Sequence, residues 1–286
     1  MLERLDLSPV ELKRKAWNIR YHVLKMICKK GKGHTGPALS IVEIITALYF
    51  GALKVDPQNP KHPDRDRFLL SKGHACTALY AGLAERGFFP VEKLGEYYQL
   101  DSLLGGHPVK GLPGVEAATG SLGHGLPISV GLALAAKFDQ KGHRIFTLIG
   151  DGEAQEGSVW EAAMAAAHYK LDNLIAIIDR NGMNLDGRTE EIMALEPFDQ
   201  KWQSFGWATR TVDGHDIPAL IQTLRAAPFA VGKPSVVIAL TVKGKGIDFI
   251  ENRKEWHHRA PTPQEAEEAF RQLEVQKAAL EKEAQS

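Results

Sequence analysis

A carboxylate and a carboxamide stand 30 residues apart, each close behind an apolar run of strand size. Asp151 follows the run at 144–150 within GDGEAQEG, and Asn181 follows the run at 173–179 within DRNGMNLDG. The segment at 157–170 between them is helix-like, so the pair belongs to one expected strand–helix–strand unit. Because ligands of open parallel sheets bind beyond the carboxyl ends of the strands, we expect both side chains in one crevice.

Oxygen ligands in such a crevice suit a hard cation, above all Mg²⁺. This ion seldom takes all its ligands from the protein and is commonly completed by phosphate oxygens, which the N-terminus of the next helix also attracts. Gly150 and Gly152 allow the backbone to approach a ligand closely. The competing interpretation is that Asp151 caps the following helix and Asn181 forms a turn with Gly182. The spacing and the strand–helix–strand context favour the metal–diphosphate site.

Histidine is the second chemical signal. The chain has 11 histidines and 27 glycines, and several fall together as Gly-His pairs. Imidazole donates, accepts and carries protons near neutral pH, which suits reactions at hydroxyl and carbonyl oxygens. An isolated histidine more commonly makes a structural hydrogen bond or lies at the surface. We leave His215 unassigned, and the histidines interpreted as structural or surface residues are His22, His62, His143 and His168.

Five short apolar runs alternate with helix-like segments and must position these side chains. They lie at 67–71, 144–150, 173–179, 207–213 and 235–241. Their length, their branched and large apolar residues and the helical patterns between them are typical of strands in βαβ units. We therefore predict the α/β fold class, with a parallel sheet that has helices on both faces.

The first helix is predicted at 9–30, because Ser8 and Glu11 have the spacing of a capping box and Pro9 occupies the first helical position. The residues expected to face the core are Val10, Trp17, Tyr21, Leu24 and Ile27. The basic residues expected to face the solvent are Lys13, Arg14, Lys15, Arg20, Lys25, Lys29 and Lys30.

The end of the chain has its own composition. From Pro263 to Ser286 it is rich in Ala, Glu, Gln and Lys, which predicts a peripheral helix. We therefore expect a single α/β domain over 1–262 and a helical tail over 263–286.

Composition argues against several classes of protein. Lys and Arg together number 35, as do Asp and Glu, and the net charge of +0 disfavours a nucleic-acid-binding or anionic membrane-binding surface. Cys28 and Cys76 lack the spacing of metal ligands, which disfavours a zinc site and a disulfide framework. Charged residues near the N-terminus stand where a signal peptide needs its apolar region, so we expect a cytoplasmic protein.

The sequence around the Asp–Asn pair resembles the N-terminal, diphosphate-binding half of transketolase. GDG followed about 30 residues later by Asn is the thiamine-diphosphate motif, and nearly the whole chain takes part in the resemblance. Its segments follow in the order expected of that family: GHTGPALS at 33–40, DRFLLSKGHA at 66–75, GGHP at 105–108, TGSLGHG at 119–125, GDGEAQEG at 150–157, DRNGMNLDG at 179–187, DGHD at 213–216, KGKG at 243–246 and WHHRAP at 256–261. The resemblance implies the thiamine-diphosphate-binding fold.

The same resemblance implies thiamine diphosphate and Mg²⁺ as cofactors, with Ca²⁺ or Mn²⁺ as alternatives to Mg²⁺. Asp151 and Asn181 would bind the metal through their side chains, and Met183 through its carbonyl. Glu156 matches a glutamate that the family buries at the interface between subunits near the pyrimidine, and an ordinary acid at a helix N-terminus is the alternative. The full set implied to bind the organic cofactor is His74, Gly120, Leu122, Gly150, Asp151, Gly152, Glu156, Asn181 and His257.

Catalytic histidines are implied as well. His34 and His257 would handle protons on the acceptor aldehyde oxygen, His107 would hold donor hydroxyls, and His74 would lie beside cofactor and substrate. His257 is preferred to His258 because the family has histidine directly after Trp and glycine next, where this chain has His258.

One more histidine departs from the family pattern. His124 stands where many relatives carry Gln. A structural hydrogen bond and a part in catalysis are the open alternatives for its side chain.

The implied reaction transfers a two-carbon ketol unit from a ketose, or a ketose phosphate, to an aldose. In the family, a second, pyrimidine-binding domain supplies the glutamate that activates the cofactor and most residues that grip the sugar phosphate. The sequence after WHHRAP leaves no room for that domain. We therefore expect the N-terminal subunit of a split transketolase, paired with a separate C-terminal subunit in an α2β2 heterotetramer.

Other functions stay open from the sequence. The alpha-type subunit of a thiamine-dependent 2-oxo-acid dehydrogenase also carries GDG, but it lacks DRFLLSKGHA and WHHRAP. A 1-deoxyxylulose-5-phosphate synthase shares the first histidine motif, yet it normally holds both domains in one chain. A non-catalytic subunit that keeps the fold would be expected to lose Asp151, Asn181 or the histidines. A nucleotide-binding Rossmann protein is disfavoured because GKGHTG at 31–36 follows no predicted strand.

Overall fold

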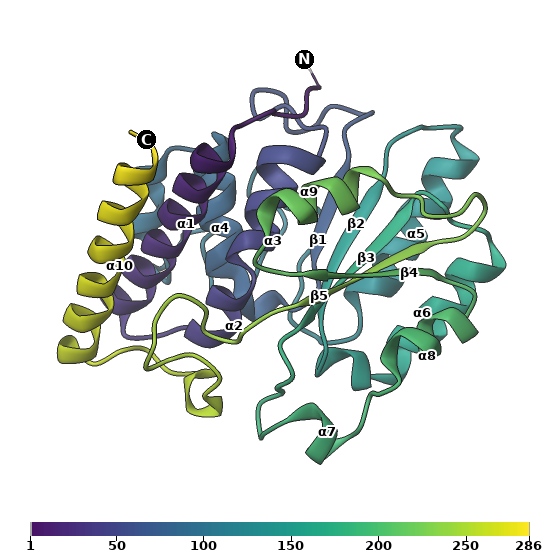
Figure 1. Ribbon diagram of the computed structural model, residues 1–286. Coiled ribbons are helices and arrows are strands. Elements are labelled where there is room, and N and C mark those ends of the chain that lie inside the picture. Colours follow the sequence, from purple (N-terminus) through teal and green to yellow (C-terminus); the bar gives the residue numbers. More distant parts are fainter. Residues whose placement is uncertain (1, 286) are drawn as a thin grey trace.

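The computed structural model describes residues 2–285, which form a five-stranded parallel sheet between two layers of helices (Figure 1). The strands lie within the predicted runs: β1 (Arg67–Leu70), β2 (Ile145–Gly150), β3 (Leu174–Arg180), β4 (Ala208–Asp213) and β5 (Ser235–Leu240). Their order across the sheet is β1-β2-β3-β5-β4, and each neighbouring pair is parallel. The predicted fold class is confirmed.

Helices of very different length surround the sheet. The longer ones are α1 (Pro9–Lys30), α4 (Cys76–Arg86), α5 (Gly125–Phe138), α6 (Gly157–His168), α9 (Ile217–Arg225) and α10 (Pro263–Glu283). The shorter ones are α2 (Thr35–Ser40), α3 (Val42–Ala47), α7 (Thr189–Ile192) and α8 (Phe198–Ser204). Single helical turns complete the set: η1 (Leu48–Ala52), η2 (Gly73–Ala75), η3 (Val91–Glu96), η4 (Glu153–Gln155) and η5 (Lys254–Trp256).

Successive residues of β2 point to opposite faces of the sheet and join different hydrophobic clusters. Phe146 packs in the cluster that contains α1, α3, α4 and α9, whereas Ile145 packs in the cluster that contains α5, α6 and α8. The same alternation separates Ile177 from Ile178 in β3. Because both faces are covered, these strands appear in the sequence as continuous apolar runs. β4 is an edge strand, and most of its side chains are partly or fully exposed.

α1 begins as its capping signals predict. Ser8 accepts a hydrogen bond from the backbone of Glu11, and the Glu11 carboxylate accepts one from the backbone of Ser8. Leu24 and Ile27 face the core, as expected. Gly31 ends the helix in the left-handed conformation, with φ of 64°, which favours glycine there.

The structure corrects two expectations for α1. Val10, Trp17 and Tyr21 are only half-buried, and α10 rather than the sheet packs against the two aromatic rings. Arg20, expected in the solvent, is buried and ion-paired with Glu43 of α3. An opposite charge at contact distance offsets part of the desolvation cost of burying a guanidinium, which the sequence spacing of α1 does not reveal.

The helix expected in the tail is α10, which packs along α1 (Figure 1). Ala269 and Leu273 are fully buried in this contact. The division of the chain between a domain over 1–262 and a tail over 263–286 stays a prediction. Across residues 2–285, the helices lack the combination of length and apolar character that crossing a bilayer would require.

Candidate active site

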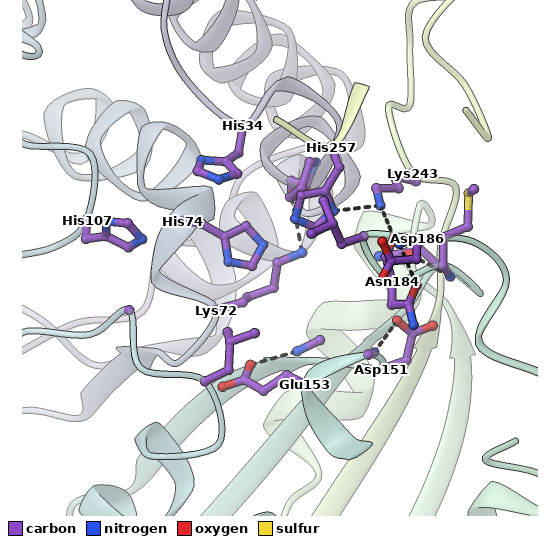
Figure 2. A pocket seen from close by; sticks show the side chains of 18 residues that line it. His34, Lys72, His74, His107, Asp151, Glu153, Asn184, Asp186, Lys243 and His257 are labelled. Carbon is purple, nitrogen blue, oxygen red and sulfur yellow. Dashed lines mark hydrogen bonds between the residues drawn. The ribbon is translucent and has the colours of Figure 1, made fainter. Parts of the chain in front are cut away.

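A cavity of about 340 Å³ lies at the carboxyl ends of β2 and β3 (Figure 2). The predicted site residues that line it are His34, His74, His107, Gly120, Leu122, Gly150, Asp151, Gly152, Asn181, Met183 and His257. Glu156 does not line it, because this residue is exposed at the N-terminus of α6. The crevice therefore forms where the order of the strands predicts it.

Asp151 follows the last residue of β2 and is fully buried. One carboxylate oxygen accepts a hydrogen bond from the backbone of Gly152 at 2.8 Å, and the other accepts one from the backbone of Gly182 at 2.6 Å. Burial raises the pKa of Asp151 to about 6, and the negative charge of Asp179 adds to that effect. The carboxylate thus ties β2 to the loop after β3 and does not cap α6, which begins at Gly157.

Asn181 follows β3 and is held on both sides of its carboxamide. Nδ2 donates to Oδ2 of Asp179 at 2.8 Å, and Oδ1 accepts from the backbone of Met183 at 3.0 Å. A short bridge between Met183 and Arg188 shapes the loop. Its hydrogen bonds are accepted by the carbonyls of Gly182 and Gly187, so the bridge does not use the carbonyl of Met183.

The donor atoms fit a hard cation. The side chains of Asp151 and Asn181 and the carbonyl of Met183 offer only oxygen at this edge of the sheet, which suits Mg²⁺ or Ca²⁺. No group of three His, Cys, Asp or Glu side chains within residues 2–285 has the geometry of a metal site. A single carboxylate with neutral oxygens leaves positions that phosphate oxygens would fill, which is how Mg²⁺ is commonly held.

Asp179 is a buried anion that the sequence alone did not single out. Nζ of Lys72 lies 2.5 Å from its Oδ2, and Oγ of Ser40 donates to its Oδ1 at 2.5 Å. Thr241 donates to the same oxygen, and Asn181 completes the set. Burial by itself raises the pKa of Asp179, but Lys72 and these hydrogen bonds outweigh burial and lower it. The ion pair therefore fixes the floor of the cavity.

Glu153 is a second buried carboxylate missed by sequence reasoning. It lies in the turn η4, and its oxygens accept hydrogen bonds from the backbone of Gly123 at 2.9 Å and of Gly150 at 3.1 Å. Ser71 Oγ donates to it as well, and burial raises the pKa of the carboxyl. The motifs around it in the sequence contain Ser71 and Gly123, but their contact with Glu153 is made only by folding.

Four histidines from separate segments meet in the cavity (Figure 2). The ring centroids of His34 and His74 are 5.0 Å apart, and those of His74 and His257 are 5.2 Å apart. His107 lies 6.2 Å from His34. His258 is exposed and does not line the cavity, but its ring lies 4.4 Å from that of His34.

Burial controls the charge of this cluster. It lowers the pKa of His34 to about 4 and of His257 to about 3, with the neighbouring histidines and lysines adding to the effect. Burial also lowers the pKa of His74 and of His107. The rings are therefore neutral at physiological pH and offer both a donor and an acceptor to hydroxyl and carbonyl oxygens.

Lys243 is a further cavity residue to which the sequence assigned no role. Its ammonium is 1% exposed and donates to the carbonyl of Asn184 at 2.8 Å. The same nitrogen lies 2.9 Å from Nδ1 of His257. Burial lowers the pKa of Lys243 to about 8. The only signal in the sequence was the segment KGKG at 243–246, which does not reveal which lysine is buried.

Glycine is required where two loops of the cavity touch. A Cβ on Gly73 would lie 2.6 Å from Oγ1 of Thr119 and 2.9 Å from the backbone nitrogen of Gly120. Gly120 itself has φ of +145°, and a Cβ there would lie 2.8 Å from Cδ2 of His107. These contacts explain why small residues surround the histidines.

Some of the remaining histidines behave as expected. His62 and His168 are exposed, and His22 lies 3.3 Å from Glu85. The interpretation of His143 was wrong, because it is buried and its Nδ1 has no hydrogen-bond partner in the described part of the chain.

The two unassigned histidines have local roles in the structure. His215 is fixed between Glu43, at 2.9 Å from its Nδ1, and the backbone of Val242, which donates to its Nε2 at 2.8 Å. His124 is exposed, and its Nδ1 lies 3.0 Å from the carbonyl oxygen of Leu122. Neither lines the cavity.

Comparisons with known proteins agree with this geometry. The family described as transketolase, thiamine diphosphate binding domain, matches residues 12–279. One of the two chains of apulose-4-phosphate transketolase from Actinobacillus succinogenes is 48% identical over 270 residues, which are 94% of this chain and 98% of that protein. The 6-deoxy-6-sulfo-D-fructose transketolase subunit SqwG of a Clostridium species is 43% identical, with coverage of 94% and 98%.

Solved structures extend the likeness to three dimensions. The crystal structure of transketolase from Campylobacter jejuni superimposes with a TM-score of 0.88 and 33% sequence identity. The match covers 93% of this chain and 43% of that one, so this chain spans less than half of the solved protein.

Proposed function

Because the chain belongs to the transketolase thiamine-diphosphate-binding family, we propose that it is the diphosphate-binding subunit of a two-chain transketolase. Its reaction is the transfer of a two-carbon ketol unit from a ketose, or a ketose phosphate, to an aldose. The domain is one that binds thiamine diphosphate, and we add Mg²⁺ as the metal that joins the diphosphate to the protein. The cytoplasmic location expected from the sequence stays a prediction.

One observation carries the proposal: a single cavity holds both the oxygen-rich crevice and the histidine cluster. Asp151, Asn181 and the carbonyl of Met183 would hold the metal, and the backbone of Gly120 and Leu122 would lie along the organic cofactor. Metal and phosphate therefore meet at the carboxyl ends of the strands, while the imidazoles stand where a sugar would lie.

The cofactor, when bound, supplies the carbon nucleophile and takes up the electrons of the cleaved bond. This chain's own residues orient the sugar and manage its protons. His107 accepts and donates hydrogen bonds to the donor hydroxyls, and His74 lies beside both ligands. His34 and His257 hold a proton at the carbonyl oxygen of the acceptor, which neutral imidazoles do without charging a desolvated site.

A second chain is part of the proposal. The two apulose-4-phosphate transketolase relatives match this chain over 94% and 98% of their own length, and each is named as one subunit, which implies another. Leu185 lines the cavity and is 57% exposed, and Ile128 and Met164 expose further apolar surface on α5 and α6. A pyrimidine-binding subunit that covers the cavity would bury such side chains and place Glu156 at an interface. We propose an α2β2 assembly.

Reconstitution tests the proposal. The chain and a pyrimidine-binding partner are purified separately, then assayed alone and together with thiamine diphosphate, Mg²⁺, a ketose donor and an aldose acceptor. Donors include pentose phosphates and the sugars in the relatives' names, apulose 4-phosphate and 6-deoxy-6-sulfo-D-fructose. We expect ketol transfer only with both chains. Turnover by this chain alone would refute the two-chain enzyme, and decarboxylation of pyruvate without ketol transfer would indicate a 2-oxo-acid dehydrogenase.

The metal site has a separate test. Asp151→Ala is expected to abolish the Mg²⁺-dependent part of thiamine-diphosphate binding to the assembled enzyme, measured by titration calorimetry. Asp139→Ala is the matched control, because Asp139 is exposed at the end of α5. Unchanged affinity in the Asp151 variant would exclude this carboxylate as a metal ligand.

A further inference from the structure

The buried ammonium of Lys243 stands between two parts of the cavity that are distant in the sequence. It contacts the carbonyl of Asn184, in the loop after β3, and Nδ1 of His257, after η5 (Figure 2). Lys72, the other buried lysine of the cavity, is ion-paired with the carboxylate of Asp179. Lys243 instead directs its hydrogen bonds at a carbonyl and an imidazole, and neither contact is used by the function proposed above.

The chemistry of the two groups restricts how they can meet. An ammonium has three N–H donors and no acceptor, so at 2.9 Å the atom facing it must offer a lone pair. Nδ1 of His257 is then unprotonated, and a neutral imidazole with Nδ1 unprotonated carries its hydrogen on Nε2. The contact therefore selects one tautomer of His257.

The surroundings of His257 disfavour the imidazolium form as well. The titratable groups near the ring are Lys72, Lys243, His34, His74 and His258, none of which is an anion. A positive charge on His257 would repel the two lysines in a desolvated site. The ring thus stays neutral while the lysine beside it stays charged.

We propose that Lys243 is a positioning residue that holds His257 as the Nε2–H tautomer, so that His257 presents a proton donor to the sugar oxygen. This inference rests on the proposed function and deepens it: the oxygen that His257 meets is a carbonyl or alkoxide, which needs a donor. His257 is a donor in this arrangement from the start of the reaction and does not act as the first base.

The lysine is itself held in place, which makes it able to orient its neighbours. Gly244 donates from its backbone to the carbonyl of Gly36 at 3.1 Å, and Asn252 donates to the carbonyl of Lys243 at 2.9 Å. A Cβ on Gly36 would lie 3.3 Å from Cγ of Lys243, so the lysine stem packs directly on α2. Segments from four parts of the chain therefore share this contact.

Nuclear magnetic resonance of the full chain with ¹⁵N-labelled histidine tests the assignment without any turnover. The signals of His257 are identified by their loss in His257→Gln. We expect the parent to show an unprotonated Nδ1 and a protonated Nε2 between pH 6 and pH 8. A protonated Nδ1 in the parent chain would overturn the proposal, and this result does not depend on the folding of any variant.

Variants of Lys243 test the cause. In Lys243→Met we expect a mixture of tautomers and a titration midpoint of His257 that moves up by about 1 to 3 pH units. Lys243→Gln keeps an N–H donor and should retain the Nε2–H form. Lys245→Met is the matched control, because this half-exposed lysine of the same segment pairs with Glu251 at 3.4 Å. A His257 spectrum unchanged in a folded Lys243→Met chain would contradict the proposal.

The assembled enzyme provides an independent readout. Lys243→Met is expected to lower kcat about 10² to 10⁴-fold, the range of general acid–base catalysis, with a much smaller change in KM for the donor. A loss in KM alone would speak for a role in binding and against the proposal. If the paired chains transfer no ketol unit at all, the proposed function fails, while the tautomer of His257 is still decided by the spectrum.

Discussion

Nη1 of Arg180 lies 3.1 Å from Oδ2 of Asp151, so a guanidinium at the end of β3 holds the buried carboxylate at the end of β2. The same side chain donates to Thr189, Glu190 and Glu196 in the segment that follows the loop. A cation from the protein itself therefore stands beside the carboxylate to which we assign the metal.

This contact leads to a prediction about stability. In Arg180→Met the buried Asp151 loses its cation, so we expect the unloaded chain to melt several degrees lower, for a loss of about 2–4 kcal/mol. Mg²⁺ with thiamine diphosphate should restore most of the difference, because the metal then compensates the carboxylate. Thermal unfolding with and without both ligands measures this. Arg188→Met, at a partly exposed position nearby, is the control. A difference that persists in the loaded protein would argue against the compensation.

Glu153 gives a second prediction. Glu153→Ala leaves the Ser71 hydroxyl and two backbone N–H groups without an acceptor in a buried site, which should cost about 2–4 kcal/mol of unfolding free energy. Glu153→Gln keeps one acceptor oxygen and should lose less. Urea unfolding followed by circular dichroism compares them with Glu161→Ala, an exposed position on α6. Equal losses for Ala and Gln would show that the hydrogen bonds are not the cause.

Glu43 predicts a dependence of stability on pH. Burial alone raises the pKa of this carboxyl, but Arg20 and His215 outweigh it and bring the pKa from 4.5 to about 2. A lowered folded-state pKa stabilises the fold above pH 4.5, by about 3 kcal/mol, and this contribution disappears as the pH falls toward 2. Glu43→Gln should therefore be destabilised at pH 7 and approach the parent near pH 2.5. Urea unfolding at both values measures it, with the exposed Glu267→Gln as control. A gap independent of pH would contradict the linkage.

Packing at Gly73 supports a fourth prediction. A methyl group there would meet Thr119 and the backbone of Gly120, which cannot yield without moving the loop, so Gly73→Ala should lose about 1–3 kcal/mol. Its affinity for thiamine diphosphate should fall too if Gly120 lies along the cofactor. Gly131→Ala has open space around the new methyl group and lies within α5, so it should be neutral or slightly stabilising. Calorimetric unfolding and cofactor titration compare the two, and equal behaviour would refute the steric argument.

Much of the fold was predictable because its signals are local. The strands lie within short apolar runs, and α1 begins where Ser8, Pro9 and Glu11 stand together. The position of the crevice follows from the parallel order alone, since Asp151 and Asn181 both come after strands that end at one edge. The histidines of the cavity were identified from their motifs rather than from any physical pattern.

The charged interior was not predictable in this way. Lys72 and Asp179 are 107 residues apart in the sequence, and Ser71 and Glu153 are 82 apart. Arg20 has the spacing of any basic residue on the outer side of a helix, and only folding places Glu43 opposite to it.

By itself, then, the amino-acid sequence determined the α/β class, the strand ends and the set of polar residues delivered to them. Only the tertiary structure decided which of the many lysines, carboxylates and histidines are buried, and which partner each one meets. The physical reason is that periodicity and capping depend on neighbours a few residues away. The charge state of Asp151, Lys243 or His257 depends on desolvation and on groups that folding brings from far along the chain.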